Sequence, residues 1–299
     1  MPNLTKPTAP ISGDHHLAAG DCLLHVRIGG VAAGLPTVVL EAGGGSTLET
    51  WDLVTQQLTP YLRVLSYERA GVGSSEGHGA GSAEVAGRLS ALLDAARIER
   101  PVILAGHSLG GLYARCFTAA HPRDVAGLVL IDSTPDDQPV PRLLLWLLPV
   151  LGWGAHLAAR SGLQRLLGGS RAATAPPAML AAQLKAKSRT SHVRAVLAEI
   201  RTLPRTQRDA AAQILPRTLP VLCITAGTRP GASKAGAAIM QSSHDRLAAA
   251  GSKPWSRHHC IAGATHASLL TDAEHATTVG KLILEFAGRI AAGAPQAAD

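Results

Sequence analysis

Residues 106–110 carry the pattern of a serine that acts as a nucleophile. They read Gly-His-Ser-Leu-Gly, with the apolar run 101–105 before them and a helical segment, 112–120, after them. A strand, a sharp turn and a helix in this order lift a serine hydroxyl above the end of a sheet. An ordinary glycine loop is the alternative, but the flanking elements favour Ser108 as a nucleophile.

A serine hydroxyl is a weak nucleophile at neutral pH, so it needs a base and a group that orients the base. His266 lies in a loop between the last predicted strand, 259–262, and the last predicted helix, where its ring can reach the serine. Asp132 ends the strand that follows the helix of the serine. The other candidate strand end is followed by no carboxylate until Asp245. We therefore predict that His266 and Asp132 complete a triad with Ser108, and Asp245 is the alternative acid.

Acyl transfer also requires hydrogen-bond donors for the negative charge that develops on the carbonyl oxygen. The backbone N–H of Leu109, the residue after the serine, supplies one donor. We expect the second at Gly44, in the Ala-Gly-Gly-Gly loop 42–45 that follows the strand 37–41. Glycine lets bare backbone approach a substrate closely, which favours an oxyanion loop over the alternative of a flexible turn.

These residues need a scaffold, and strands that alternate with helices along the chain predict one. The expected fold is α/β, with a mostly parallel central sheet and helices on both faces. We assign 21–132 and 218–292 to this core, 1–20 to a flexible lead and 293–299 to a flexible tail. Residues 133–217 contain no convincing strand, so we interpret them as a helical cap over the strand ends, where ligands bind in such sheets.

Four further residues are assigned to substrate binding. Gly43 and His107 lie beside the oxyanion donors, although the His107 ring is expected to point away from the serine. Trp146 and Trp153 belong to the apolar run 143–153 of the cap. Because this run is shorter than a membrane span and contains a proline, we interpret it as a cap helix that faces the core. An apolar substrate wall and a peripheral membrane contact are the alternatives.

Composition narrows the range of partners. Of the 299 residues 46% are hydrophobic and only 3% aromatic, and the net charge of +7 is scattered. Without a platform of aromatic side chains, no nucleic-acid partner is expected. The four cysteines match no zinc pattern, so we expect neither a metal nor a cofactor.

The first 20 residues hold no apolar core of a signal peptide, and a cytoplasmic location is expected. The sequence does not indicate an oligomeric state.

Together these motifs resemble the α/β-hydrolase fold superfamily, in its serine esterase and lipase branch. The resemblance covers about 22–291 and is carried by four segments: the glycine loop 40–46 followed by Trp51, the segment 67–74, the turn 106–111 and the loop around His266.

Some positions depart from that pattern. Many relatives have His-Gly where this chain has Ala42-Gly43, and Asp is usual at Glu68. The acid of many relatives follows the strand that ends here at Gly227. This chain has no carboxylate directly after that strand. In this respect it is similar to pancreatic-type lipases, which carry the acid after the preceding strand. Epoxide hydrolases and haloalkane dehalogenases of this fold use an aspartate at the position of Ser108.

The resemblance and the residues imply the same activity. We expect a cofactor-free serine hydrolase that cleaves small carboxylic esters through an acyl-enzyme, with apolar acyl groups of short to medium length. A lactonase, an amidase or a perhydrolase would use the same residues. A non-catalytic protein that binds a membrane surface is an alternative of a different class.

Overall fold

The computed structural model describes residues 11–293, apart from 33, 80, 139, 141–142, 144–145, 148–153, 156, 158–174, 231–233 and 254. Strands in this part form a single sheet with the order β1-β2-β4-β3-β5-β6-β7-β8. β1 and β2 are antiparallel to each other, β2 is antiparallel to β4, and the remaining pairs are parallel. The bounds are β1 Gly13–Ala19, β2 Cys22–Gly29, β3 Val38–Glu41, β4 Val64–Tyr67, β5 Val102–His107, β6 Val125–Ile131, β7 Val221–Ala226 and β8 Arg257–Ile261.

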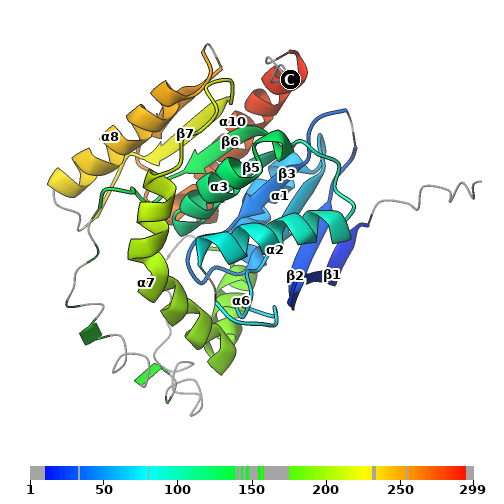
Figure 1. Ribbon diagram of the computed structural model, residues 1–299, viewed down its shortest axis with the longest axis vertical. Helices are drawn as coiled ribbons and strands as arrows, with labels where there is room; N and C mark the ends of the chain where they lie inside the picture. Colours follow the sequence, from blue (N-terminus) through cyan, green and yellow to red (C-terminus); the bar gives the residue numbers. More distant parts are fainter. Residues whose placement is uncertain are drawn as a thin grey trace, which may run out of the picture.

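Helices cover both faces of the sheet, as predicted (Figure 1). The apolar side chains of α2, α3 and α8 pack on one face, and those of α1, α9 and α10 pack on the other. The helices that carry these faces are α1 Asp52–Leu58, α2 Ser82–Ala95, α3 Leu109–Ala120, α8 Lys234–Ala250, α9 Ser268–Thr271 and α10 Ala273–Ala291, and two short 3-10 turns are η1 Leu48–Trp51 and η2 Pro122–Asp124.

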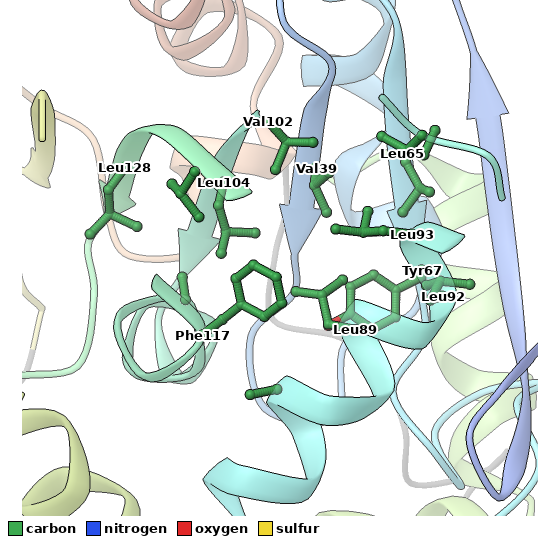
Figure 2. Packing of buried hydrophobic residues seen from close by; sticks show 14 of the residues in the cluster. Val39, Leu65, Tyr67, Leu89, Leu92, Leu93, Val102, Leu104, Phe117 and Leu128 are labelled. Carbon is green, nitrogen blue, oxygen red and sulfur yellow. The ribbon is translucent and has the colours of Figure 1, made fainter. Parts of the chain in front are cut away.

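The inner strands are mostly apolar because both of their faces are covered. Every residue of β3, β5 and β7 is buried. Figure 2 shows one of the two layers, in which Val39 and Leu104 of the strands face Leu89 of α2 and Phe117 of α3. This packing fixes the strand ends, and therefore the loops that carry the candidate site.

The strand order also locates the site. From β3 the chain passes to β4 on one side and then crosses to β5 on the other side, so the order reverses at the neighbours β3 and β5. Ligands bind outside the carboxyl ends of parallel strands at such a switch point, because the two following loops diverge there. These two loops are the glycine loop 42–45 and the turn at Ser108.

The described residues of 133–217 form helices and contain no strand, as predicted for the cap. Its two long helices are α6 Pro177–Lys187 and α7 Thr190–Ala211, which lie at one end of the sheet (Figure 1). α7 packs against α3, and α6 packs against η1. In the run 143–153, Leu143 is 66% exposed and Trp146 is 76% exposed, so the expectation that this run faces the core is wrong for these two residues. Trp153 lies outside the described residues. Among the helices that the structure describes, none combines the length and the apolar character that a bilayer span requires.

The expectation of a flexible lead over 1–20 is wrong for its second half. Residues Gly13–Ala19 form β1, which pairs with β2 in a register that sets Leu17 against Leu24. The strand lies at the edge of the sheet, and only Ala19 is fully buried in it. Because most of its side chains face solvent, it lacks the apolar run that marks the inner strands.

Candidate functional site

Ser108 stands at a sharp turn between β5 and α3. Its φ of 54° and ψ of −124° lie outside the helical and extended regions, which is strained for a residue with a Cβ. Glycines make the turn possible. A Cβ on Gly106 would lie 2.5 Å from the Gly110 carbonyl oxygen, and one on Gly110 would lie 2.3 Å from that of Glu41. The strand-turn-helix context predicted for the serine is therefore present.

Asp132 and His266 are hydrogen-bonded to each other next to this turn. Asp132 follows β6 with a φ of 43°, and His266 lies in the loop between β8 and α9. Nδ1 of His266 donates to Oδ2 of Asp132 at 2.6 Å. The second carboxylate oxygen, Oδ1, accepts from the Ala226 N–H at 3.0 Å and from the guanidinium of Arg229. The carboxylate is thus fully engaged and aims one oxygen at the ring.

The charge state of this pair suits a base. Asp132 is completely buried, which alone would raise the pKa of its carboxyl. The hydrogen bond and charge of His266, with the contacts to Ala226 and Arg229, outweigh burial and hold that pKa well below its ordinary value. An ionised Asp132 keeps the proton of neutral His266 on Nδ1, so Nε2 carries the lone pair that a base needs.

His107 lies differently from the expectation of a substrate contact. Its side chain is buried, stacks on the His266 ring with centroids 4.6 Å apart, and donates from Nε2 to the His266 carbonyl oxygen at 3.1 Å. Burial lowers the pKa of His107 to about 3, so the ring is neutral and does not repel a protonated His266. Because His107 precedes Ser108, it ties the histidine loop to the turn.

Asp245, the alternative acid, is paired with a different histidine. It lies on α8 and is 59% exposed, with Oδ1 accepting from His258 Nδ1 at 2.6 Å. His258 belongs to β8, at the far edge of the sheet. Of the two candidate acids, the structure brings only Asp132 to His266.

Arg69, in the loop after β4, is hydrogen-bonded to the glycine loop. The guanidinium donates to the carbonyl oxygens of Ala42 and Gly43. In a trans peptide the N–H points opposite to the C=O, so the N–H groups of Gly43 and Gly44 point away from Arg69. A Cβ on Gly43 would lie 3.4 Å from the Cβ of Ser108, so the glycine loop passes close to the serine.

Leu109 is the other predicted donor. It is the first residue of α3, where backbone N–H groups have no acceptor within the helix and the helix dipole is positive. A Cβ on Gly44 would lie 3.5 Å from the Leu109 side chain, so the glycine loop and the helix start are in contact. The assignment of Leu109 and Gly44 as oxyanion donors stays a prediction.

A buried ionic network supports the loop, and sequence reasoning missed it. Arg69 donates to Glu41 at 2.5 Å and to Glu199 of α7 at 2.7 Å, and all three side chains are at most 5% exposed. Glu199 also accepts from the Gly45 N–H at 2.9 Å. Burial opposes the charge of Arg69, but the two carboxylates outweigh it and raise the pKa of the guanidinium well above its usual value.

The sequence carried part of this signal. Arg69 belongs to the segment 67–74, which carries part of the resemblance, but no pattern in this segment indicates its contacts with the glycine loop. Glu199 lies in the middle of a cap helix with no motif around it, and only the fold shows which residues it meets.

With regard to metals, the described residues contain no group of three histidine, cysteine or acidic side chains arranged to bind an ion.

The comparisons with known proteins agree with this architecture. A model of the alpha/beta hydrolase family matches residues 38–278. The chain belongs to this family. The matched range begins at β3 and ends within α10, and it includes both loops at the switch point, the cap and the His266 loop.

Individual relatives match this alpha/beta hydrolase over only about a third of the chain. An AB hydrolase superfamily protein of Gibberella zeae is 33% identical over 108 residues, which are 34% of this chain and 33% of that protein. The pimeloyl-acyl-carrier-protein methyl ester esterase of Klebsiella pneumoniae is 34% identical over 107 residues, 34% of this chain and 40% of the esterase. The chain spans less than half the length of these relatives.

Solved structures show the same fold over nearly the whole chain. A thermophilic esterase from Thermogutta terrifontis matches with a TM-score of 0.67, over 93% of this chain and 99% of the esterase, at 16% sequence identity. Because the identity is low, this likeness concerns the fold alone.

Proposed function

We propose that this alpha/beta hydrolase is a serine esterase that cleaves carboxylic esters through an acyl-enzyme. The observation that carries the proposal is the 2.6 Å hydrogen bond from His266 Nδ1 to buried Asp132, which leaves the lone pair on Nε2, beside a strained serine. The fold alone would not support it, because many chemistries share this scaffold.

In the first half of the reaction, the Ser108 hydroxyl attacks the ester carbonyl while Nε2 of His266 takes its proton. Asp132 stabilises the imidazolium, and the N–H groups of Leu109 and Gly44 hold the oxyanion, with the Gly43 N–H on the same side of the loop. Collapse of the tetrahedral intermediate breaks the ester bond, and His266 gives the proton to the departing alkoxide. The alcohol leaves and an acyl-serine remains.

In the second half, water replaces the alcohol. His266 takes a proton from the water, the hydroxide attacks the acyl carbonyl, and the same N–H groups hold the second oxyanion. Ser108 leaves with the proton from His266, which frees the carboxylic acid. Apart from the water, the groups that this cycle uses belong to the chain itself.

The same residues would also serve lactone, amide or peracid chemistry, so the choice of an ester as the substrate needs support of its own. The name of the Klebsiella pneumoniae relative, a methyl ester esterase, favours an ester. A panel of p-nitrophenyl esters of increasing acyl length, measured beside a lactone and an anilide, tests this. Ester turnover that exceeds the others supports the proposal, and turnover confined to the anilide contradicts it.

We expect apolar acyl groups of short to medium length to be preferred over charged ones. This expectation rests on the sequence of the cap, whose run 143–153 is strongly apolar. In the p-nitrophenyl panel, kcat/KM should rise from acetate towards butyrate or hexanoate, and succinate monoesters should react slowly. Equal turnover of the charged and the uncharged ester of one length would contradict the apolar pocket.

Glu199→Gln is expected to lower kcat by roughly tenfold to a hundredfold with little change in KM, because loosening an oxyanion donor weakens only transition-state binding. The amide retains an acceptor for Gly45 N–H but removes the negative charge that faces Arg69. Steady-state kinetics on p-nitrophenyl butyrate measure the effect, with the exposed Glu274→Gln of α10 as the matched control. A purely raised KM would argue that Glu199 binds substrate instead.

A further inference from the structure

The excess positive charge of the chain is concentrated in the cap. Basic residues occur along the whole sequence, but residues 133–217 hold 12 of the 28 lysines and arginines and only 4 of the 21 acidic residues. The cap therefore has a formal net charge of +8, and the rest of the chain carries −1. A charge of this size in one segment indicates the part of the surface that would meet an anionic partner.

The long cap helix α7 arranges part of this charge in one row. Arg194, Arg201, Arg205 and Arg208 follow one another at intervals of 7, 4 and 3 positions, which places them on one side of an α-helix. All four side chains are exposed, and the opposite side of α7 is buried and carries Glu199. At 1.5 Å per residue the row is about 21 Å long. We call these four arginines the arginine face.

The acidic residues of α7 neutralise little of the arginine face. Glu199 is buried on the other side of the helix, and Asp209 lies 3.9 Å from Arg205, which is 77% exposed. Among the residues that the structure describes, Arg201 and Arg208 have no carboxylate within ion-pair distance. Because a guanidinium remains protonated at every pH at which proteins fold, the arginine face is cationic regardless of titration elsewhere.

Exposed apolar side chains lie in the same segment of the chain. Seven large apolar side chains are exposed in the described part of the protein, and four of them belong to the cap. They are Leu143, Trp146, Leu157 and Ile214, with exposed fractions from 55% to 91%. A single exposed leucine is ordinary, but four such side chains in the segment that carries the charge are typical of a binding surface.

Hydrogen bonds tether the first of these apolar residues to α7. Gln207, a neighbour of the arginine face in sequence, donates from Nε2 to the carbonyl oxygens of Pro135 and Gln138 at 2.8 and 2.7 Å. Leu143 is five residues beyond Gln138, so their Cα atoms are at most about 18 Å apart. Ile214 follows the last residue of α7 by three positions. The apolar side chains and the arginine face therefore belong to the same end of the molecule.

We propose that the cap docks on an anionic lipid surface through the arginine face, with the exposed apolar side chains beside it entering the interfacial layer. Charge complementarity selects an anionic partner, because each arginine close to such a surface strengthens binding roughly fivefold. Trp146 and its apolar neighbours select lipid, because tryptophan and leucine are stabilised at the boundary between headgroups and acyl chains. The scarcity of aromatic residues argues against a nucleic acid.

Docking gives the two sides of α7 separate tasks. The buried side carries Glu199, which accepts from the Gly45 N–H in the glycine loop, and the arginine face contacts the lipid. A docked protein would meet esters that partition into the lipid at a raised local concentration, a consequence that rests on the proposed esterase function. The docking itself goes beyond that function and does not require it.

Co-sedimentation with lipid vesicles tests the docking without use of the catalytic activity. The wild-type protein should bind vesicles of equimolar phosphatidylcholine and phosphatidylserine, should not bind vesicles of phosphatidylcholine alone, and should be released by salt, which screens the arginine face. Absence of binding to the mixed vesicles at low salt, or equal binding to both kinds of vesicle, overturns the proposal.

Charge reversal then locates the contact. The triple variant Arg201→Glu, Arg205→Glu and Arg208→Glu should bind the mixed vesicles more than about a hundredfold more weakly. A control with the same change in net charge replaces three exposed basic residues outside the cap, and it should bind within about threefold of wild type, because charges far from the surface are screened. An equal loss in both variants overturns the proposal. The control consists of Lys253→Glu, Arg257→Glu and Lys281→Glu.

The variant Trp146→Ala separates lipid from other polyanions. It should weaken vesicle binding several-fold, since the indole no longer enters the interfacial layer. Fluorescence anisotropy with labelled polyglutamate and with a labelled DNA duplex measures the competing partners at the same concentration of negative charge. If either polyanion bound the arginine face as tightly as the vesicles do, or if Trp146→Ala bound vesicles like wild type, the lipid assignment would be wrong.

Folding and activity keep the outcomes distinct. Circular dichroism and turnover of soluble p-nitrophenyl butyrate should be unchanged in the triple variant, because the arginine face points away from the side of α7 that carries Glu199. If the triple variant does not fold, Arg201→Glu takes its place, with an expected loss of about tenfold in vesicle binding. Vesicle binding by a protein without esterase activity leaves the docking standing and contradicts the proposed function. Esterase activity without vesicle binding contradicts the docking alone.

Discussion

Replacing Ser108 with alanine is expected to remove esterase activity by roughly 10⁴-fold to 10⁶-fold, because loss of a serine nucleophile leaves only binding and oxyanion stabilisation. The fold should remain intact. The substitution removes one oxygen, and an alanine at this position carries the same Cβ in the same backbone conformation. Initial rates on p-nitrophenyl butyrate, with circular dichroism to check the fold, measure both expectations.

The control is a serine that takes no part in the site. Ser12→Ala changes an exposed side chain before β1 and should leave kcat and KM unchanged. If Ser108→Ala retained more than about a tenth of the wild-type rate, the nucleophile would be another group and the assignment of the turn would be wrong.

Asp132→Asn is expected to lower kcat by roughly 10³-fold to 10⁴-fold with little change in KM, as loss of an orienting carboxylate does in other triads. The amide would turn its NH₂ group towards His266, because Oδ1 must still accept from Ala226 and Arg229. His266 then carries its proton on Nε2 and no longer serves as a base. Steady-state kinetics and the pH profile measure this loss.

Asp245→Asn is the matched variant, because both aspartates are hydrogen-bonded to a histidine Nδ1 at 2.6 Å. At pH 7 it should remain within about tenfold of the wild-type kcat, since Asp245 acts on the site only through several intervening groups. If the two variants behaved the other way round, the acid would lie on α8 and the triad proposed here would be incorrect.

The sequence was most informative where local pattern and tertiary environment agree. Inner strands such as β5 and β6 are buried on both faces, so their apolar runs are visible without a structure. The Ser108 turn has a pattern imposed by steric crowding, because Gly106 and Gly110 lie against neighbouring backbone. Asp132 could be selected because strand order follows from right-handed crossovers, which make β6 the neighbour of β5.

Long-range contacts of single polar residues could not be predicted in this way. Glu199 meets Arg69 across 130 positions of sequence, and His244 meets Ser133 across 111. Neither pair has a spacing or a flanking motif, because the fold alone brings them together. β1 escaped prediction for a different reason, since an edge strand with exposed side chains shows no apolar run.

The central claim is that Ser108 becomes covalently acylated with the help of His266 and Asp132. Intact-protein mass spectrometry after treatment with a fluorophosphonate probe, followed by peptide mapping, tests it most directly. The account predicts a single adduct on Ser108 in the wild-type protein, much slower labelling in Asp132→Asn and none in Ser108→Ala. An adduct on another residue, or labelling that persists at the wild-type rate in Ser108→Ala, would contradict it.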